Sequence, residues 1–395
     1  MKILMFGHIP SWAGGKQEHG LANVIYNLAL ALSYESDAEV TLAATDVRGK
    51  EIKRGNLTIK GWDACELLFY AICHPILCYS FFIYLFNNRQ LLAPLESIKS
   101  YLFKGLFLRK TIKEISPEIL HLHEASSWFY VKIVPKNVKI VVTFHGPYGI
   151  SADIPYNESY SILEHSYLYS DRISEVLFIS HTLLDEYKKY YKDIVTSTDV
   201  ILNAYNDKVF NFIEPISHEG LRICTIGTLQ PRKGQLRVLE GMKDSGVSYS
   251  YYTIGVGSKE AEEELYSFSK THGIKYTHLG KKKPEEIREV LSWMDFMILP
   301  SSSEGFGLVF LETIACGVKV ILPKGLPIVQ EGSIIKPSIN SILLENYSSA
   351  AISKVMKELE TNYQYDHKMV SQSISSCTWS QISKQYFNSF KKIIA

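Results

Sequence analysis

The sequence predicts an α/β protein of two domains, each a parallel sheet covered by helices. The chain has 395 residues, more than one core of ordinary size requires. Short β-branched runs alternate with helix-length patterns, which is typical of βαβ units. This rhythm restarts at "LRICTIGTL", after a segment rich in Asn, Pro and Gly over 203–220 that we interpret as a linker. We therefore expect domains over 1–205 and 206–377.

The first half holds six apolar, β-branched runs that predict strands. They are Lys2–Gly7, Val40–Ala44, Ile119–His123, Val138–Phe144, Val176–Ile179 and Val200–Leu202. A helix is expected at about 16–33, where apolar residues recur at helical spacing.

The second half repeats the pattern with five predicted strands and helices between them. The strands are Leu221–Ile226, Ser250–Ile254, Lys275–His278, Phe296–Leu299 and Val318–Leu322. The clearest helical patterns are 258–272 and 284–293.

Bulk composition excludes several classes of protein. Hydrophobic residues make up 46% and charged residues 21%, as in ordinary globular chains. A formal net charge of +1 gives no global field that would gather nucleic acid. The six cysteines are scattered without paired metal spacing, which favours reduced thiols. The first apolar run is too short for a signal peptide, so we expect a cytosolic protein.

One apolar stretch leaves three interpretations open. Residues 67–86 contain no Asp, Glu, Lys or Arg, and twenty such residues are long enough to span a bilayer. His74, Pro75 and the strands on both sides argue against a span. The following residues, 89–113, carry six basic side chains against only Glu96. Over 67–113 we favour peripheral contact with the anionic inner face of the cell membrane, above a buried core helix or a true span.

The stretch "DFMILPSSSEGFGLVFLE" predicts a ligand site. A buried strand ends at Pro300, and a helix should begin near Gly307. Its free N–H groups suit a phosphate. Glu304 precedes this helix and Glu312 lies more than one turn inside it, so they cannot share a proton. Carboxylates accept hydrogen bonds from vicinal diols, and a sugar, a phosphate and a ribose together describe a nucleotide sugar.

Positive charge for the diphosphate is expected from "GTLQPRKGQ", which carries Arg232 and Lys233. An Arg–Lys pair in a loop is usually only solvated, but its place beside the glutamate turn favours a function. Each half also opens with a strand that runs into glycines, and neither run is a dinucleotide or P-loop motif.

These motifs resemble the retaining glycosyltransferases of the GT-B fold known as family 4. "EGFGLVFLE" looks like that family's Glu-x7-Glu signature, and "TIGTLQPRKG" resembles its diphosphate loop. "YTIGVGS" and "THLGKK" resemble its nucleotide-side turns, and "PSWAGGKQEHG" its N-terminal glycine loop. The resemblance implies two Rossmann-like domains facing across a cleft. "TWSQISKQY" looks like the family's terminal helix, implying that 378–395 return to the first domain.

The resemblance also implies residue roles. Glu304 would hold donor-sugar hydroxyls, Glu312 the ribose diol, and Arg232 and Lys233 the diphosphate. The remaining donor-side positions implied are Gly14, Gly15, Gly227, Gly255, Lys281, Phe306, Gly307, Leu308 and Val309. Net retention of configuration without a metal ion or other cofactor is implied. No nucleophile is evident, so a front-face displacement assisted by a donor phosphate oxygen is expected.

Two strand ends carry histidines. In "EILHLHEAS", His121 and His123 share one face of a strand, and "VVTFHGPYG" ends with His145. Strand-end histidines are often only structural. The similarity of "HLHE" to lipid-acceptor members of the family favours His123 as the group that orients the acceptor or the leaving phosphate. His145 is the second acceptor-side candidate.

We therefore expect a glycosyltransferase that moves a sugar from a nucleotide diphosphate, with UDP preferred to GDP, to a glycan or lipid-linked acceptor. Bacterial surface polysaccharide or lipopolysaccharide assembly is the expected setting. Thr228 and Lys319 depart from the family pattern and leave the donor specificity open. A nucleotide-sugar epimerase of the same architecture, or a catalytically silent binding subunit, are the alternative interpretations.

Overall fold

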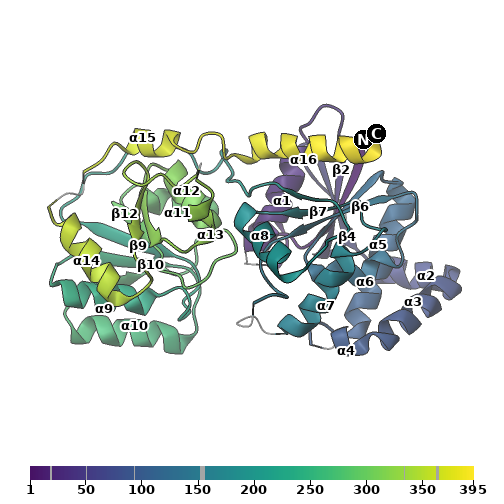
Figure 1. Ribbon diagram of the computed structural model, residues 1–395, viewed down its shortest axis with the longest axis horizontal. Coiled ribbons are helices and arrows are strands. Elements are labelled where there is room, and N and C mark those ends of the chain that lie inside the picture. The colour runs from purple at the N-terminus through teal and green to yellow at the C-terminus, as the bar shows by residue number, and fades with distance from the viewer. Residues whose placement is uncertain (18–19, 50, 93, 152–155, 333, 362–363) are drawn as a thin grey trace. The chain divides into compact units, whose positions relative to one another are not determined.

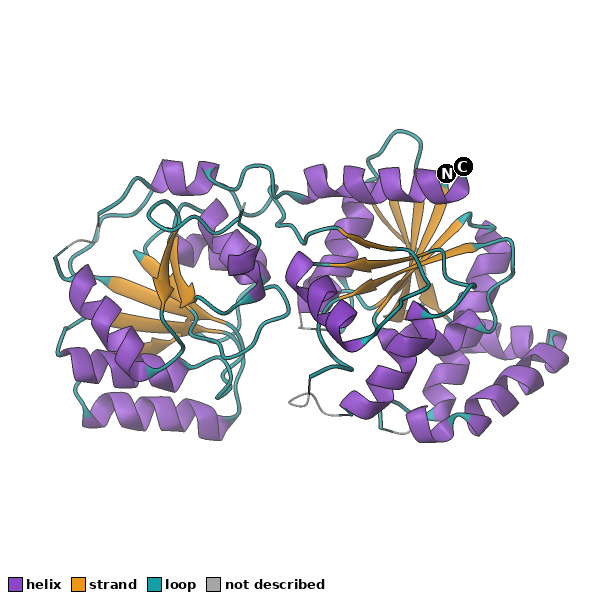
Figure 2. Ribbon diagram, in the orientation of Figure 1, coloured by secondary structure: helices purple, strands orange, loops and turns teal. Residues whose placement is uncertain are grey.

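The chain forms two compact α/β units. The computed structural model describes residues 1–17, 20–49, 51–92, 94–151, 156–332, 334–361 and 364–395. Unit 1 comprises Met1–Asn203 and Trp379–Ala395, and unit 2 comprises Ala204–Thr378. In each unit helices lie on both faces of a largely parallel sheet (Figures 1 and 2).

Unit 1 contains an eight-stranded sheet in the order β3-β4-β2-β1-β5-β6-β7-β8. The strands are β1 (Lys2–Gly7), β2 (Glu39–Arg48), β3 (Ile52–Arg54), β4 (Leu57–Trp62), β5 (Ile119–His123), β6 (Lys139–Phe144), β7 (Glu175–Phe178) and β8 (Thr198–Val200). Among the strands described in this unit, only β3 pairs antiparallel, with β4. The sequence did not predict this edge pair, because both strands are short and alternate with polar residues instead of forming an apolar run.

The helices of unit 1 include the C-terminal segment of the chain. They are η1 (Ser11–Ala13), α1 (Gly20–Leu32), α2 (Ala64–Cys73), α3 (Pro75–Asn87), α4 (Arg89–Leu92), α5 (Ile98–Ile115), η2 (Ala125–Ser127), α6 (Trp128–Val131), α7 (Asn157–Leu168), α8 (His181–Tyr190) and α16 (Trp379–Ile394). Helix α16 packs against α1 and buries Tyr386 and Phe390 beside His121. The predicted return of the C-terminal helix to the first domain is confirmed.

The first helix begins later than predicted. Residues 18–19 lie outside the described part of the chain, and α1 is described from Gly20. The Lys16 amide donates to Asp46 instead of starting a helix, and Gln17 pairs with Pro10. Tertiary contacts therefore hold these residues in a loop.

Unit 2 contains a six-stranded parallel sheet in the order β11-β10-β9-β12-β13-β14. The strands are β9 (Arg222–Ile226), β10 (Ser250–Ile254), β11 (Lys275–His278), β12 (Phe296–Ile298), β13 (Lys319–Pro323) and β14 (Ser341–Leu344). The helices are α9 (Gln235–Ser245), α10 (Lys259–Thr271), α11 (Pro284–Leu291), α12 (Leu308–Ala315), α13 (Pro327–Gln330), α14 (Ser349–Leu359) and α15 (His367–Gln372). The predicted linker is packed on this unit, for example through the Ile216 amide and the Ser292 carbonyl.

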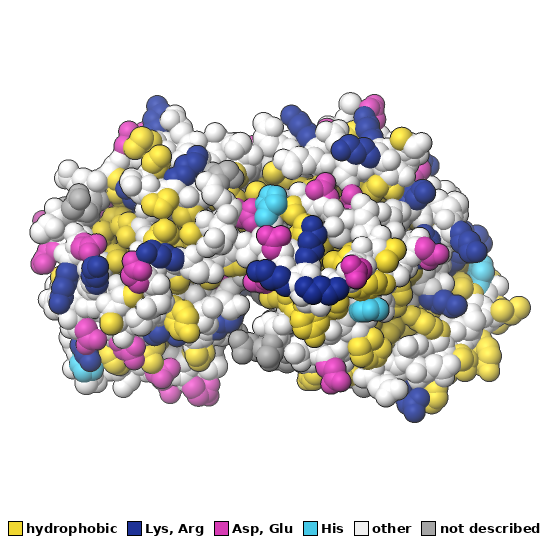
Figure 3. All heavy atoms as spheres, viewed as in Figure 1, with side chains coloured by type: hydrophobic (Ala, Val, Ile, Leu, Met, Phe, Trp, Pro, Cys, Tyr) yellow, Lys and Arg dark blue, Asp and Glu magenta, His cyan; other side chains and the backbone are white. Residues whose placement is uncertain are grey.

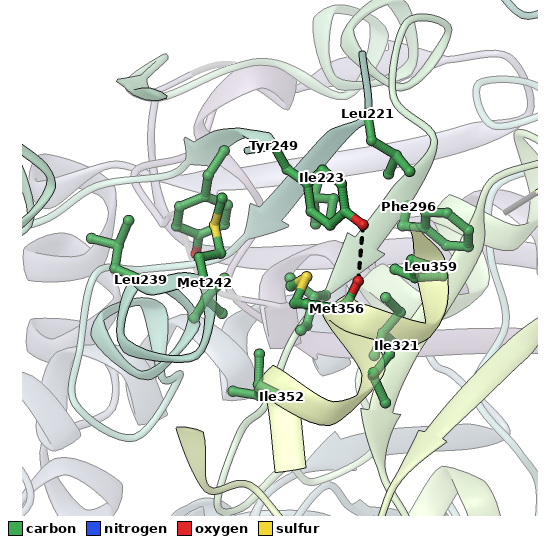
Figure 4. Packing of buried hydrophobic residues seen from close by; sticks show 14 of the residues in the cluster. Leu221, Ile223, Leu239, Met242, Tyr249, Phe296, Ile321, Ile352, Met356 and Leu359 are labelled. Atoms are coloured by element: carbon green, nitrogen blue, oxygen red, sulfur yellow. Dashed lines mark hydrogen bonds between the residues drawn. The ribbon is translucent and has the colours of Figure 1, made fainter. Parts of the chain in front are cut away.

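Apolar packing of α9 and α14 fixes the frame of unit 2. Figure 4 shows Met242 and Leu239 facing Ile352 and Met356 beside the sheet. The Tyr249 hydroxyl donates to the Met356 carbonyl at 2.9 Å, which satisfies a polar group inside this core.

The apolar stretch 67–86 forms two helices rather than one. Within the described chain no single helix is long and apolar enough to cross a bilayer; α2 and α3 reach that length only as a pair bent by 103°. The break falls at His74–Pro75, where proline begins α3. Each helix buries one side and exposes the other, so the interpretation of this segment as a buried core helix is wrong (Figure 3).

Gly105 sets how closely α3 packs against α5. A Cβ atom at this position would lie 2.3 Å from Cε1 of Phe81, a fully buried ring. We expect Gly105→Ala to lower the free energy of unfolding by about 1–3 kcal/mol despite its gain in helix propensity. Chemical denaturation measures this. Gly20→Ala is the matched control, since Gly20 has open space around it, and equal effects of the two would contradict the packing argument.

Candidate functional site

Two loops of unit 2 meet at the point where the strand order reverses. Strand β9 pairs with β10 on one side and with β12 on the other, so the strand order reverses between β9 and β12. Ligands of such sheets bind at this switch point. The loop after β12 donates the Ser302 amide to the Arg232 carbonyl of the loop after β9, at 3.0 Å. Arg237 bridges the same loops by donating to Pro300 at 2.9 Å and Pro231 at 2.9 Å. Arg237 was not predicted from the sequence. Its place four residues after Lys233 is the one signal that could have indicated it.

An ion pair links the predicted acid and base of these loops. The Lys233 ammonium donates to Oε1 of Glu304 at 2.6 Å, and Nη1 of Arg232 lies 3.7 Å from the same oxygen. The side chains of Lys233 and Glu304 are only 14% and 9% exposed, whereas that of Arg232 is 44% exposed. The tertiary structure thus brings Glu304 to the predicted basic pair, which lies at least 71 positions away in sequence.

The start of α12 presents free backbone donors beside this pair. Gly307 caps the helix with φ +86°, and a side chain there would overlap the ring of Phe310. The Phe310 amide donates to the Gly307 carbonyl, whereas the amides of Leu308 and Val309 have no acceptor among the described residues. Phe306 is buried and anchors the turn. A helix start with unpaired N–H groups suits an anion.

Glu312 lies in the second turn of α12 with no hydrogen-bond or ion partner among the residues that the structure describes. The surrounding protein largely encloses it, and burial raises the pKa of its carboxyl group to about 7. A carboxylate held without a partner is costly, which suits a group that a ligand must satisfy.

The turns after β9, β10 and β11 lie side by side. The Gly227 amide donates to Ile254 at 2.8 Å, and the Gly255 amide donates to Gly280, the residue before Lys281, at 3.0 Å. A side chain on Gly255 would lie 2.1 Å from the Gly227 carbonyl oxygen. The predicted nucleotide-side glycines are therefore brought together at one sheet edge.

The N-terminal glycine loop of unit 1 is closed on itself. The amide of Gly14 donates to Ser11 at 3.1 Å and that of Gly15 to Pro10 at 3.0 Å, so both N–H groups are used within the loop. A side chain on Gly15 would lie 2.0 Å from the Ile9 carbonyl oxygen. Asp46 of β2, which sequence reasoning missed, accepts from the Ile9 amide at 3.2 Å and shapes this loop.

A cavity of about 340 Å³ opens at the carboxyl ends of β1 and β5 in unit 1. This is the switch point of the first sheet. Its polar wall includes His8, Gln17, Thr45, Lys104, His123 and Glu124. The size and the mixed lining are those of a small-molecule site.

The three histidines have different places around this cavity. His123 lines it, and Nδ1 of His123 lies 3.0 Å from Nε2 of His145, which stands behind it. His121 bonds Thr143 at 2.8 Å and packs against α16 instead. Burial lowers the pKa of His121 and His145 to about 3, and burial with the two neighbouring rings lowers that of His123, so all three are neutral at pH 7. Nε2 of His123 is buried and unpaired within the described chain.

Glu124 is a cavity residue that sequence reasoning missed, although "HLHE" places an acid directly after a strand. Its backbone has φ +66° and ψ 153°, a region that only glycine adopts freely and that costs other residues about 1–3 kcal/mol. Burial raises the pKa of its carboxyl group to about 7, and Lys104 opposes the rise.

The raised pKa of Glu312 implies that the stability of the fold depends on pH. A folded-state pKa near 7 lies above the ordinary value of 4.5, so the fold loses stability as the pH rises from 4.5 through 7. We expect ligand-free Glu312→Gln to melt higher than wild type at pH 8, with the difference shrinking toward pH 5. One pKa unit corresponds to about 1.4 kcal/mol, so the gain is at most a few kcal/mol. Melting curves check this against the exposed control Glu358→Gln, and a difference independent of pH would contradict it.

Two family models match the chain. The model described as Glycosyl transferases group 1 matches residues 207–375, and the model described as Glycosyltransferase Family 4 matches residues 19–208. An uncharacterized glycosyltransferase of Methanocaldococcus jannaschii is 25% identical over 67% of this chain and 71% of its own length. The N-acetyl-alpha-D-glucosaminyl L-malate synthase of Bacillus anthracis is 26% identical over 54% of this chain and 59% of that enzyme.

Solved structures share the fold across nearly the whole chain. The sucrose-phosphate synthase of Thermosynechococcus elongatus has a TM-score of 0.75 at 15% identity, covering 99% of this chain and 98% of that one. Anabaena HepE in complex with UDP-glucose has a TM-score of 0.68 at 14% identity, covering 99% and 100%. The predicted GT-B fold is thereby confirmed. The chain belongs to the group 1, family 4 glycosyltransferases, and it is a transferase that uses a nucleotide-sugar donor.

Proposed function

We propose that this enzyme is a retaining glycosyltransferase that moves a sugar from UDP to a hydroxyl group of a glycan or lipid-linked acceptor. Surface polysaccharide or lipopolysaccharide assembly in bacteria is the setting we propose. The observation that carries the donor assignment is the Lys233–Glu304 pair beside the open amides of α12. The UDP-glucose complex of HepE supports uridine as the base.

In the ligand-free state Lys233 and Glu304 neutralise each other. A pyrophosphate seated on the Leu308 and Val309 amides would offer Lys233 a doubly charged partner in place of a single carboxylate. Charge-assisted hydrogen bonds contribute about 1.5–3 kcal/mol each, so this exchange releases Glu304 at little net cost. The freed carboxylate then accepts hydrogen bonds from the sugar hydroxyls, as Glu312 does from the ribose.

Departure of the nucleotide diphosphate leaves negative charge on the β-phosphate. Lys233 and Arg232 are positioned to stabilise that charge, and we propose that they take the role of a metal ion. Amides around Phe306, Gly307 and Leu308 would add preorganised dipoles. A donor phosphate oxygen would accept the acceptor's proton, so the sugar is delivered to the face from which UDP leaves and its configuration is retained.

We also propose that α2 and α3 rest on an anionic membrane. Their outer sides expose Phe69 and Ile76 at 70% and 84%, together with other large apolar residues: Leu68, Ile72, Tyr79, Phe82 and Phe86. Figure 3 shows these yellow side chains gathered at the end of unit 1 where Figure 1 labels α2 and α3. Such an apolar surface suits a lipid-linked acceptor.

The charge beside this surface is smaller than the sequence indicated. Glu96 is not the only acid near the basic residues, because Lys110 pairs with Glu66 at 2.9 Å and with Glu114 at 2.6 Å. Lys104 pairs with Glu96 at 2.7 Å. Apolar insertion should therefore contribute more to membrane binding than electrostatic attraction.

Removing the ammonium group tests the donor site. We expect Lys233→Ala to lower kcat by about 10²–10³ with a UDP-sugar, since a preorganised stabilising charge is lost. Steady-state assays measure this, after a thermal-shift screen of UDP, GDP and their sugar conjugates has chosen the donor. Lys243→Ala, on the exposed surface of α9, is the matched control. Full activity of Lys233→Ala would contradict the phosphate role, and an epimer formed from donor alone would favour the epimerase.

Vesicle flotation tests the membrane surface. We expect the protein to float with phosphatidylglycerol vesicles, and Phe69→Gln/Ile76→Gln to lower the bound fraction at least several-fold, because it removes inserted apolar area. Val195→Gln/Ile216→Gln changes two exposed apolar residues elsewhere and serves as the control. Absence of binding with and without anionic lipid would refute the proposal.

A further inference from the structure

The cavity of unit 1 contains an acid that the fold holds at a cost. Glu124 follows β5 directly, and its amide still donates to the Thr143 carbonyl at 3.1 Å, so its backbone position is fixed by the sheet. Its φ and ψ lie where glycine is the ordinary residue. Among the described residues no group donates a hydrogen bond to its carboxylate. The carboxylate of a strained, half-buried residue that no described group donates to has no stabilising role that would explain it.

A second group beside Glu124 also lacks a partner. His123 is only 6% exposed, and its Nε2 has no hydrogen-bond partner within the described chain. Its Nδ1 forms a hydrogen bond with Nε2 of His145. Neutral imidazole offers one donor or one acceptor at Nε2, according to which way the bond to His145 runs. The two groups are consecutive in sequence and line the same cavity.

The cavity offers an anion no unpaired positive charge among the lining residues that the structure describes. Its one lysine, Lys104, is held by both oxygens of Glu96, at 2.7 and 2.8 Å. His8 bonds Thr45 at 3.0 Å and lies 4.0 Å from Asp46, which balances any charge it carries. At pH 8, above its pKa of about 7, Glu124 is ionised, so a phosphate or carboxylate entering here would meet its negative charge without an unpaired cation to offset the repulsion.

From these contacts we infer that the acceptor group bound in this cavity is a neutral polyol, such as a sugar ring, one of whose hydroxyl groups donates to Glu124 and another of which bonds His123. Hydroxyl groups supply the donors that the carboxylate lacks, and their uncharged oxygens avoid the repulsion. The inference deepens the proposed function and rests on it, because it names the acceptor chemistry of the same enzyme.

Paired ligands test it at pH 8, where Glu124 is ionised, on the full chain saturated with UDP. Ligand-observed NMR titration would compare glucose, galactose and myo-inositol, each with its own monophosphate. We expect wild type to bind the neutral member of at least one pair about tenfold or more tightly than its phosphate. Glu124→Gln, which keeps the size of the side chain but removes its charge, should cut that preference about tenfold. Glu358→Gln, the same change at an exposed position of unit 2, should leave it unchanged.

A tighter phosphate in wild type, an unchanged preference in Glu124→Gln, or no binding by either member of any pair would overturn the inference. If UDP itself did not raise the melting temperature, the proposed donor site would be contradicted instead. Failure of the acceptor inference and failure of the donor site can therefore be distinguished. Glu124→Gly addresses a purely structural role. We expect it to melt no lower than wild type while losing sugar binding, and a lower melting temperature would count against a ligand-binding acid.

Discussion

The donor side of this enzyme depends on the interlock of two loops at the point where the strand order of unit 2 reverses. Neighbouring strands β9 and β12 deliver a basic loop and an acidic loop to the same edge, and backbone hydrogen bonds and Arg237 fasten them together. Opposite charges held this closely need no ligand to remain buried. In the donor site that we propose, a phosphate would compete for the lysine and sugar hydroxyl groups for the glutamate, so the two side chains would bind different parts of one ligand.

Unit 1 uses the opposite electrostatic arrangement. Its cavity is lined by His123, whose pKa burial lowers, by a lysine that is already paired, and by an acid whose pKa burial raises to about 7. Charge is therefore concentrated where we propose that a diphosphate binds, and it is offset where we propose that an acceptor enters. Unpaired polar groups in the two units, Glu312 in one and Glu124 with His123 in the other, make the binding of hydroxyl-rich ligands favourable in each.

Local sequence patterns predicted the strands correctly where burial of apolar side chains alone determines the structure. Apolar and β-branched runs predicted eleven of the strands that the structure describes, because strands buried on both faces tend to be apolar throughout. The edge strands β3 and β14, and β4 beside β3, were missed because strands at or next to an edge tolerate polar residues and short lengths. The stretch 67–86 has the length and apolar composition of a membrane-spanning helix, but Pro75 divides it into two helices. Their packing against α5 leaves one side of each helix exposed.

The sequence by itself determined the two-domain α/β class, the helix that starts after Gly307, and the acids and bases around it, since backbone freedom and residue type act locally. Only the tertiary structure decided that Lys233 meets Glu304, that both glycine amides of the N-terminal loop are occupied, and that Glu124 faces a cavity beside His123. These outcomes depend on strand order and loop contacts between residues far apart in the chain. No short-range pattern encodes which strand lies next to which, so pairings of this kind appear only after folding.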